Sequence, residues 1–208
     1  MNNSEVLLAG GISSLTVKAV CFVVNIITEQ EREAACMLQA RYSHALVRNG
    51  DLVFAIGGFK RKIRDNLSYW TTGKGPVDTV QRSNETYCTK SDTWSPMPSV
   101  PDPEGLGETS ATIYKSRLLV AGSETSNLWS YHLQNKNWTI VQKNIKITGM
   151  GRSKNSLYFI FGEEEKVVEI KEQKTSIYKG KVPAGPIVPK LIENDEGSYG
   201  IARDGTVF

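Results

Sequence analysis

The chain has 208 residues, of which 39% are hydrophobic and 23% are charged. A chain of this length can bury a hydrophobic core without disulfide bonds or bound metal ions, and this composition excludes global disorder. Lys and Arg number 25 and Asp and Glu number 22, so the net charge of +3 gives no bulk electrostatic reason to expect a nucleic acid or a membrane as partner.

Four short apolar runs that end in glycine recur along the chain. Each has four to six residues of continuous apolar character, which favours a strand buried on both faces. The runs are residues 6–11, 52–58, 118–122 and 157–162. Their recurrence indicates an internal structural repeat.

A polar pair precedes three of these runs and predicts a tight turn between two strands. The pairs are Asn49-Gly50, Lys115-Ser116 and Lys154-Asn155. Asn-Gly is the strongest of these signals, because both central residues of a type I′ turn need positive φ. Each repeat therefore begins with a β-hairpin.

A second hairpin follows each glycine, and large residues recur in it at a spacing of seven. The pairs are Tyr87 with Trp94, Tyr131 with Trp138, and Ile170 with Ile177, whereas the first unit has Val24 and Glu31 at these positions. Polar turn formers lie between the members of each of the three pairs, so we expect strand, turn and strand with the large side chains facing a common core. Each unit then has four antiparallel strands.

The glycine anchors fit the spacing of propeller blades. Gly11, Gly58, Gly122 and Gly162 are 47, 64 and 40 residues apart, with about twenty extra residues in one unit. The predicted fold is all-β, with about four four-stranded antiparallel blades and an incomplete one in a single region, residues 1–208. The blades are residues 4–38, 41–98, 107–143, 147–183 and, in part, 197–208.

The second unit resembles the kelch repeat. Residues 41–45 (Arg-Tyr-Ser-His-Ala) are similar to its first strand, Gly57-Gly58 to the diglycine of the second, residues 85–87 (Glu-Thr-Tyr) to the third, and residues 94–98 (Trp-Ser-Pro-Met-Pro) to the fourth. The match is specific over residues 41–141. The resemblance implies a kelch-like β-propeller, a ring of blades.

The two ends of the chain predict an incomplete ring. Residues 4–38 supply a second, third and fourth strand, whereas residues 199–202 and 206–208 supply a first strand and the start of a second. Propellers leave no long open edge. We therefore expect a fragment of a larger ring, or a partner that covers the gap.

The insertion at residues 59–79 is the predicted partner-binding site. It joins the second strand of its blade to the third. Lys60, Arg61, Lys62 and Arg64 favour an acidic protein surface, and Tyr69 and Trp70 are residue types enriched in binding hot spots. The alternative is a solvated loop whose aromatic side chains pack back on the blade.

Catalytic and metal sites are not expected. GxSxG, HExxH and P-loop patterns are absent, and three cysteines and two histidines show no zinc spacing. Copper oxidases of kelch-like fold use two His and two Tyr as ligands, but His44 occupies a structural position of the repeat and His132 lies far along the chain. Residues 163–165 (Glu-Glu-Glu) fit a solvated loop.

The cysteines and the N-terminus predict a cytoplasmic protein. Cys21, Cys36 and Cys88 fit small buried side chains, and no basic neighbour in sequence lowers their pKa. The N-terminus lacks a basic signal region, the apolar stretch at residues 15–27 is too short to span a bilayer, and the four N-x-S/T sequons fit chance matches.

The predicted function is therefore a noncatalytic protein–protein interaction module or scaffold, without cofactor, within a larger assembly. Two alternatives stay open. One is a kelch-type enzyme, either a copper oxidase or a sugar epimerase. The other is an architectural subunit of a large complex.

Overall fold

The computed structural model describes residues 4–13, 16–62, 77–153, 156–161, 166–171, 174–179, 190–194 and 197–201. These residues form strands, turns and extended segments and contain no helix, so the all-β prediction is confirmed. It follows that no helix in the described ranges has the length and apolar character to cross a membrane. The chain divides into two compact units, Met1–Val100 and Pro101–Phe208.

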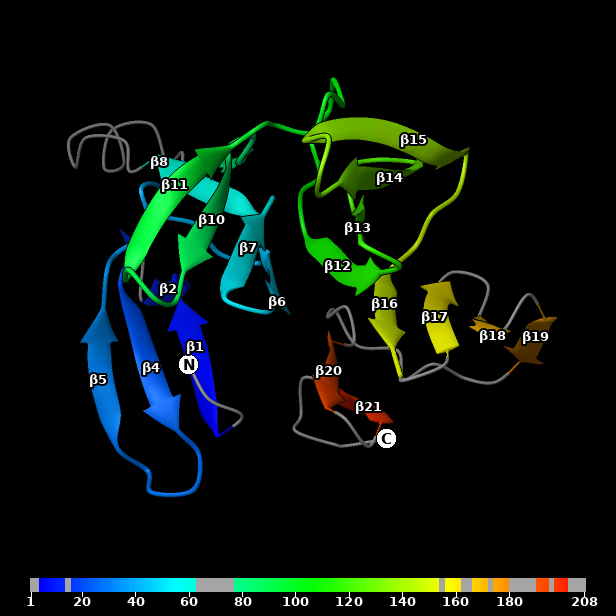
Figure 1. Cartoon of the computed structure of the whole chain (residues 1–208). Coiled ribbons are helices and arrows are strands. Elements are labelled where there is room, and N and C mark those ends of the chain that lie inside the picture. Colours follow the sequence, from blue (N-terminus) through cyan, green and yellow to red (C-terminus); the bar gives the residue numbers. More distant parts are fainter. Residues whose placement is uncertain are drawn as a thin grey trace. The chain divides into compact units, whose positions relative to one another are not determined.

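The first unit begins with a three-stranded antiparallel sheet in the order β1-β4-β5 (Figure 1). Its strands are β1 (Glu5–Ala9), β4 (Cys21–Asn25) and β5 (Glu31–Ala34). Val24 lies opposite Glu31, as the seven-residue spacing predicts. Between β1 and β4 the chain forms a small ribbon of β2 (Ile12–Ser13) and β3 (Thr16–Val17).

A four-stranded sheet in the order β11-β10-β7-β6 follows in the same unit. Its strands are β6 (Ala45–Asn49), β7 (Leu52–Ile56), β10 (Asn84–Cys88) and β11 (Thr93–Met97). The insertion joins β7 to β10, as predicted, and its two ends pair as β8 (Phe59–Lys62) and β9 (Val77–Val80). The base of the insertion is thus a β-ribbon rather than a loop.

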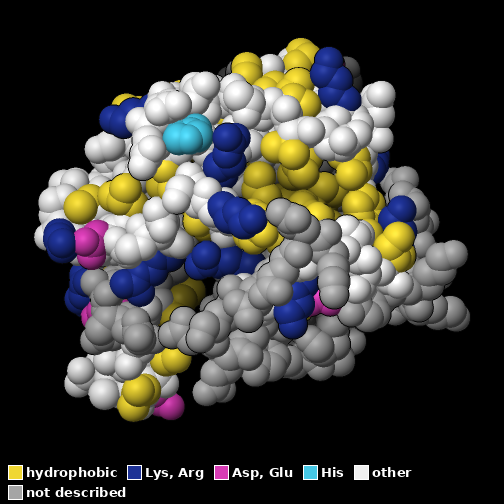
Figure 2. All heavy atoms as spheres, turned by 45° about the vertical axis from the view of Figure 1, so that its right-hand side comes forward, with side chains coloured by type: hydrophobic (Ala, Val, Ile, Leu, Met, Phe, Trp, Pro, Cys, Tyr) yellow, Lys and Arg dark blue, Asp and Glu magenta, His cyan; other side chains and the backbone are white. Residues whose placement is uncertain are grey.

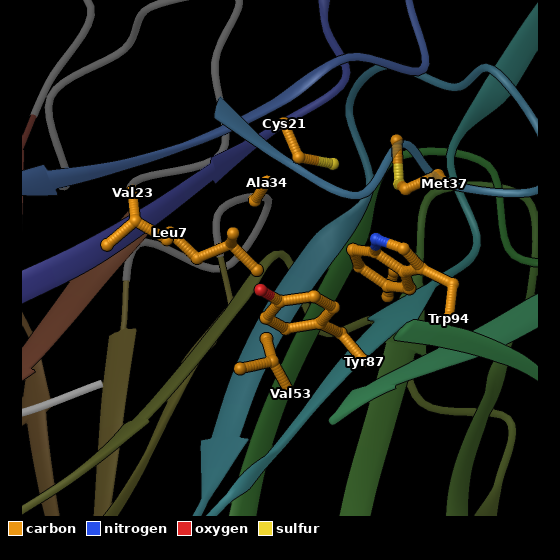
Figure 3. Close-up of a cluster of buried hydrophobic side chains, with 9 residues drawn as sticks. Leu7, Cys21, Val23, Ala34, Met37, Val53, Tyr87 and Trp94 are labelled. Atoms are coloured by element: carbon orange, nitrogen blue, oxygen red, sulfur yellow. The ribbon is translucent and has the colours of Figure 1, made fainter. Parts of the chain in front are cut away.

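Tyr87 and Trp94 lie directly opposite each other on β10 and β11 and belong to the core of the first unit. Figure 3 shows the Tyr87 ring between Leu7 and Val53, and Trp94 beside Met37. The two rings are 5.1 Å apart, and Trp94 Nε1 donates to the carbonyl of Ala35 at 2.8 Å. The predicted pairing is confirmed.

Ala35 connects the two sheets of the first unit. Its amide donates to Asp92 Oδ1 in the β10–β11 turn, and the Tyr87 hydroxyl donates to the same oxygen at 2.6 Å. Burial, followed by this hydrogen bond, raises the pKa of Tyr87 to about 12. The turn therefore locks the aromatic pair to the preceding sheet.

The second unit holds two four-stranded antiparallel sheets and one hairpin. The first sheet runs β12 (Thr109–Tyr114), β13 (Arg117–Gly122), β14 (Asn127–His132) and β15 (Asn137–Lys143). The second runs β16 (Gly149–Arg152), β17 (Ser156–Phe161), β18 (Lys166–Lys171) and β19 (Lys174–Lys179). The hairpin is β20 (Lys190–Asn194) with β21 (Gly197–Ile201).

Tyr131 and Trp138 are also direct partners in the second unit, with ring centroids 4.9 Å apart, as predicted. A core formed mainly by β13 and β17 residues joins the two sheets. Their first strands β12 and β16 are neighbours, and the Met150 amide donates to Ser110 Oγ across them at 2.8 Å.

The prediction that Ile170 and Ile177, the third seven-residue pair, lie opposite each other is wrong. Ile170 lies opposite Thr175, and Ile177 lies opposite Val168. Lys171 pairs with Lys174, so the turn has two residues where the aromatic hairpins have four. The shorter turn shifts the register, and Ile177 is 61% exposed instead of facing the core.

Of the three predicted turns, one differs in detail from the structure and one agrees with it. At Asn49-Gly50 the turn residues are Gly50 and Asp51, and of these Gly50 has positive φ, which departs from type I′. Lys115 and Ser116 both have positive φ, the pattern of a type I′ turn. The pair Lys154-Asn155 lies outside the described residues.

The predicted C-terminal strand is present as β21, but it pairs with β20. β20 was not predicted, because its sequence is short and mixed and does not end in glycine. Residues 202–208, predicted to continue the hairpin, lie outside the described ranges.

Gly58 allows residues 42–44, which precede the first strand of its sheet, to pass close to its backbone. Its φ is +85°, and a Cβ there would overlap the Tyr42 carbonyl oxygen and the backbone of His44. Gly11 has a φ of +100° but nothing within 4 Å of an added Cβ. We expect Gly58→Ala to lower the free energy of unfolding by about 1–3 kcal/mol more than Gly11→Ala, because only Gly58 adds a steric overlap to backbone strain. Urea unfolding of both variants measures this difference; equal losses would contradict the packing role of Gly58.

Candidate partner-binding surface

The β8–β9 ribbon positions the described part of the predicted partner-binding site. Side chains alternate between the faces of a strand, so Phe59 and Arg61 share one face and Lys60 projects from the other. Tyr42 pairs with Phe59 through two backbone hydrogen bonds of 2.9 and 3.1 Å. Their rings lie 5.7 Å apart, which places a small aromatic pair at the base of the ribbon.

Arg61 forms a cross-strand ion pair with Asp78. Nε and Nη2 of Arg61 donate to the two carboxylate oxygens at 2.7 and 2.9 Å, and the guanidinium lies 5.8 Å from the centre of the Tyr42 ring. The hydrogen bonds raise the pKa of Arg61 and lower the pKa of Asp78. Burial and then the Asp78 hydrogen bond raise the pKa of Tyr42. Arg61 is therefore mainly a structural tie within the ribbon, and its charge is balanced locally.

The structure brings together only part of the predicted set. Lys60 is exposed on β8, and the backbone of Lys62 pairs with Val77 at the described end of the ribbon. Arg64, Tyr69 and Trp70 lie outside the described residues. Of the four predicted cations, Lys60 is the one that the structure shows both exposed and outside the described ion pairs.

A buried ion pair between Arg41 and Glu85 lies beside this ribbon. Arg41 Nη2 donates to Glu85 Oε1, and Nη1 donates to the carbonyls of Gly57 and Ser83 at 3.1 and 2.6 Å. The Glu85 carboxylate also accepts the amides of residues 38 and 39. Burial lowers the pKa of Arg41, and Glu85 opposes that shift. Both residues belong to the kelch-like pattern, but their positions in it do not predict that they form one site.

Asp102 is a second buried polar centre, in the second unit, and the sequence analysis missed it. Its Oδ2 accepts hydrogen bonds from Thr125 Oγ1, Asn127 Nδ2 and Trp129 Nε1, and its Oδ1 accepts from the Glu104 amide. Burial by itself would raise the pKa of Asp102, but the hydrogen bonds outweigh it and the pKa is lowered. Hydrogen-bond donors at the alternate positions 125, 127 and 129 were the available signal, because the last two lie on β14 and alternate strand residues share one face.

Asp102 should make the stability of the second unit depend on pH. Its folded pKa lies below the ordinary 3.8, so its stabilisation is complete above that value and is lost as the pH falls through the folded pKa. We expect Asp102→Asn to cost about 1–3 kcal/mol near neutral pH, because the carboxylate accepts several charge-assisted hydrogen bonds. Urea unfolding at about pH 7 and about pH 3 should show this loss shrinking in acid.

Asp51→Asn is the matched control for that experiment, because Asp51 forms an exposed ion pair with Lys90. It should change stability little. A loss in Asp102→Asn that is equal at both pH values would contradict the pKa argument.

The cysteines differ from their prediction in part. Cys21 is buried, as expected, but Cys36 is exposed and Cys88 is half-buried. The pKa of Cys88 is lowered, first by a hydrogen bond from the Ser91 side chain and then by backbone amides of the same turn. The four-residue turn brings these donors back to Cys88, an effect that a search for basic sequence neighbours does not detect.

The two histidines lie in different units. His44 is buried, and His132 Nδ1 accepts the Asn135 amide at 3.2 Å within a turn. In the described part of the chain, no three His, Cys, Asp or Glu side chains gather where they could hold a metal ion. Residues 163–165 lie outside that part.

Basic side chains are spread over the surface drawn in Figure 2, with few acidic side chains among them. A search against protein-family models and a search of curated proteins gave no match to the chain.

Proposed function

We propose that the protein is a noncatalytic, kelch-like β-propeller module that binds another protein through the insertion at residues 59–79. The partner surface is acidic, and the module serves as a scaffold or adaptor within a larger cytoplasmic assembly. The observation that carries the proposal is the ribbon β8–β9, which joins two strands of a four-stranded sheet and presents Lys60 to solvent.

Repeated four-stranded antiparallel sheets support the propeller part of the proposal. In the second unit the first strand β16 lies beside both β12 and β20. First strands of successive blades lie beside one another when blades surround a common axis. The sheets are therefore compatible with blades of a ring.

The kelch-like residues also have packing roles that fit the repeat. Gly58 makes room for the segment that enters the sheet, Arg41 and Glu85 tie that segment to β10, and Tyr87 packs on Trp94. One unit thus uses the residues of its resemblance as a connected structural set. This supports the kelch-like assignment of residues 41–98.

A charge-removal experiment tests the function. We expect Lys60→Ser/Lys62→Ser/Arg64→Ser to remove one or more proteins that co-purify with the tagged wild-type chain. Affinity for such a purified partner should weaken and its salt dependence should flatten, because fewer ionic contacts form.

The matched control is Lys136→Ser/Lys143→Ser/Lys171→Ser, which removes three exposed charges elsewhere. It should retain the partner. If both triple variants bind every co-purifying protein as the wild type does, the insertion is not the binding site.

A further inference from the structure

The ribbons β2–β3 and β8–β9 are joined by residues 41 and 42. The Gly11 amide donates to the Arg41 carbonyl at 2.9 Å, and the Arg41 amide donates to the Lys18 carbonyl at 3.2 Å. On the other side, Tyr42 and Phe59 exchange two backbone hydrogen bonds. Consistent with this, β3 lies beside β8. We call residues 11–13, 16–18, 41–42, 59–62 and 77–80 the double ribbon.

Buried contacts of Arg41 anchor the link between the two ribbons. The Arg41 side chain is fully buried and binds Glu85 and the carbonyls of Gly57 and Ser83. The link between the ribbons is thus anchored to the sheet that carries β10. A surface fixed in this way loses little conformational entropy when a ligand binds.

Charge on the double ribbon has one dominant sign. Lys18 and Lys60 are exposed, one on each ribbon, and neither takes part in a described ion pair. The acidic residue of the described double ribbon is Asp78, and Arg61 balances it. An excess of positive charge therefore remains on both ribbons.

Apolar side chains accompany this charge. Ile12 on β2 is 41% exposed, and Val77 on β9 is 40% exposed. A nucleic-acid backbone offers phosphates to the lysines but little to such residues, whereas a protein segment can supply both carboxylates and apolar side chains.

We propose that the double ribbon is one binding surface for an extended protein segment that combines acidic and apolar residues, with Lys18 and Lys60 contacting its carboxylates. The inference rests on the proposed function and extends the binding site to a second ribbon, whose Lys18 lies 42 residues before Lys60 in the chain. Lys18 is its new contact residue.

Binding of a displayed peptide pool tests the inference. The pool contains peptides of about ten residues, which span about 33 Å when extended, with Asp or Glu at alternate positions and random residues elsewhere. A second pool carries Lys or Arg at those positions. We expect the full chain to enrich acidic peptides with apolar residues between the charges, and to enrich nothing from the basic pool.

The best enriched peptide is then measured by fluorescence anisotropy against single variants. Lys18→Ser and Lys60→Ser should each weaken binding roughly threefold to fivefold, as expected for one exposed ionic contact. Lys143→Ser, an exposed lysine on β15, is the control and should leave binding unchanged. Circular dichroism confirms that each variant keeps its strands.

The outcomes separate this inference from the proposed function. Loss of binding in Lys60→Ser but not in Lys18→Ser overturns the double ribbon and leaves the insertion as the binding site. If no peptide is enriched, or if all three single variants change peptide affinity equally, the inference is overturned. The proposed function is tested separately: it is overturned if the triple variant of residues 60, 62 and 64 retains every partner. Competition by a single-stranded oligonucleotide as strong as that by the peptide would identify a nucleic acid instead.

Discussion

Replacing Trp94 with alanine should lower the free energy of unfolding by about 3–5 kcal/mol. Trp94 is 8% exposed, packs on Tyr87 with ring centroids 5.1 Å apart, and donates to the Ala35 carbonyl. The substitution leaves a large cavity and an unsatisfied carbonyl between two sheets. Urea unfolding followed by circular dichroism measures the loss.

Trp138→Ala is the matched control, because Trp138 occupies the same place in its hairpin but is only half-buried. Its loss should be smaller, about 1–2 kcal/mol, since less apolar area leaves water on folding. Equal losses for the two tryptophans would contradict the burial difference between the two aromatic pairs.

Breaking the buried Arg41–Glu85 pair should cost a similar amount. Glu85→Gln leaves the Arg41 guanidinium buried beside a neutral amide, and removal of one partner of a buried pair costs about 3–5 kcal/mol. Arg41→Met should cost as much, because it leaves the Glu85 carboxylate without its cationic partner and two backbone carbonyls without a hydrogen-bond donor. Chemical denaturation of each variant measures these losses.

The double variant distinguishes an ion pair from two independent contacts. Arg41→Met with Glu85→Gln should lose clearly less than the two single losses combined, with a coupling of about 1–3 kcal/mol. Additive losses would show that the two charges do not stabilise each other in the folded protein.

Sequence patterns predicted the hairpins that have a bulky aromatic pair and a four-residue turn. Tyr87 with Trp94 and Tyr131 with Trp138 lie in the expected register because their four-residue turns place residues seven apart opposite each other. Ile170 and Ile177 share the spacing but not the register. Turn length decides that register, and composition does not show whether a polar stretch makes two turn residues or four.

The candidate site was predicted less completely than the fold. The cluster at residues 60–64 was visible because charge is local in sequence. The pairing of Arg61 with Asp78 depends on cross-strand register, and the link from Lys18 to Arg41 depends on a backbone hydrogen bond across 23 residues. Such non-local contacts leave no short motif.

The distance between strands of different sheets tests the proposed propeller most directly. Spin labels are placed by cysteine substitution, in a variant whose three native cysteines are replaced by serine, at two exposed pairs of sites. One pair, Asn49 and Lys115, lies at the ends of the first strands β6 and β12; the other, Ser95 and Thr139, lies on the fourth strands β11 and β15. Because blades radiate from an axis, the first-strand pair should be closer than the fourth-strand pair in pulsed electron paramagnetic resonance. A fourth-strand distance equal to or shorter than the first-strand distance would contradict a propeller.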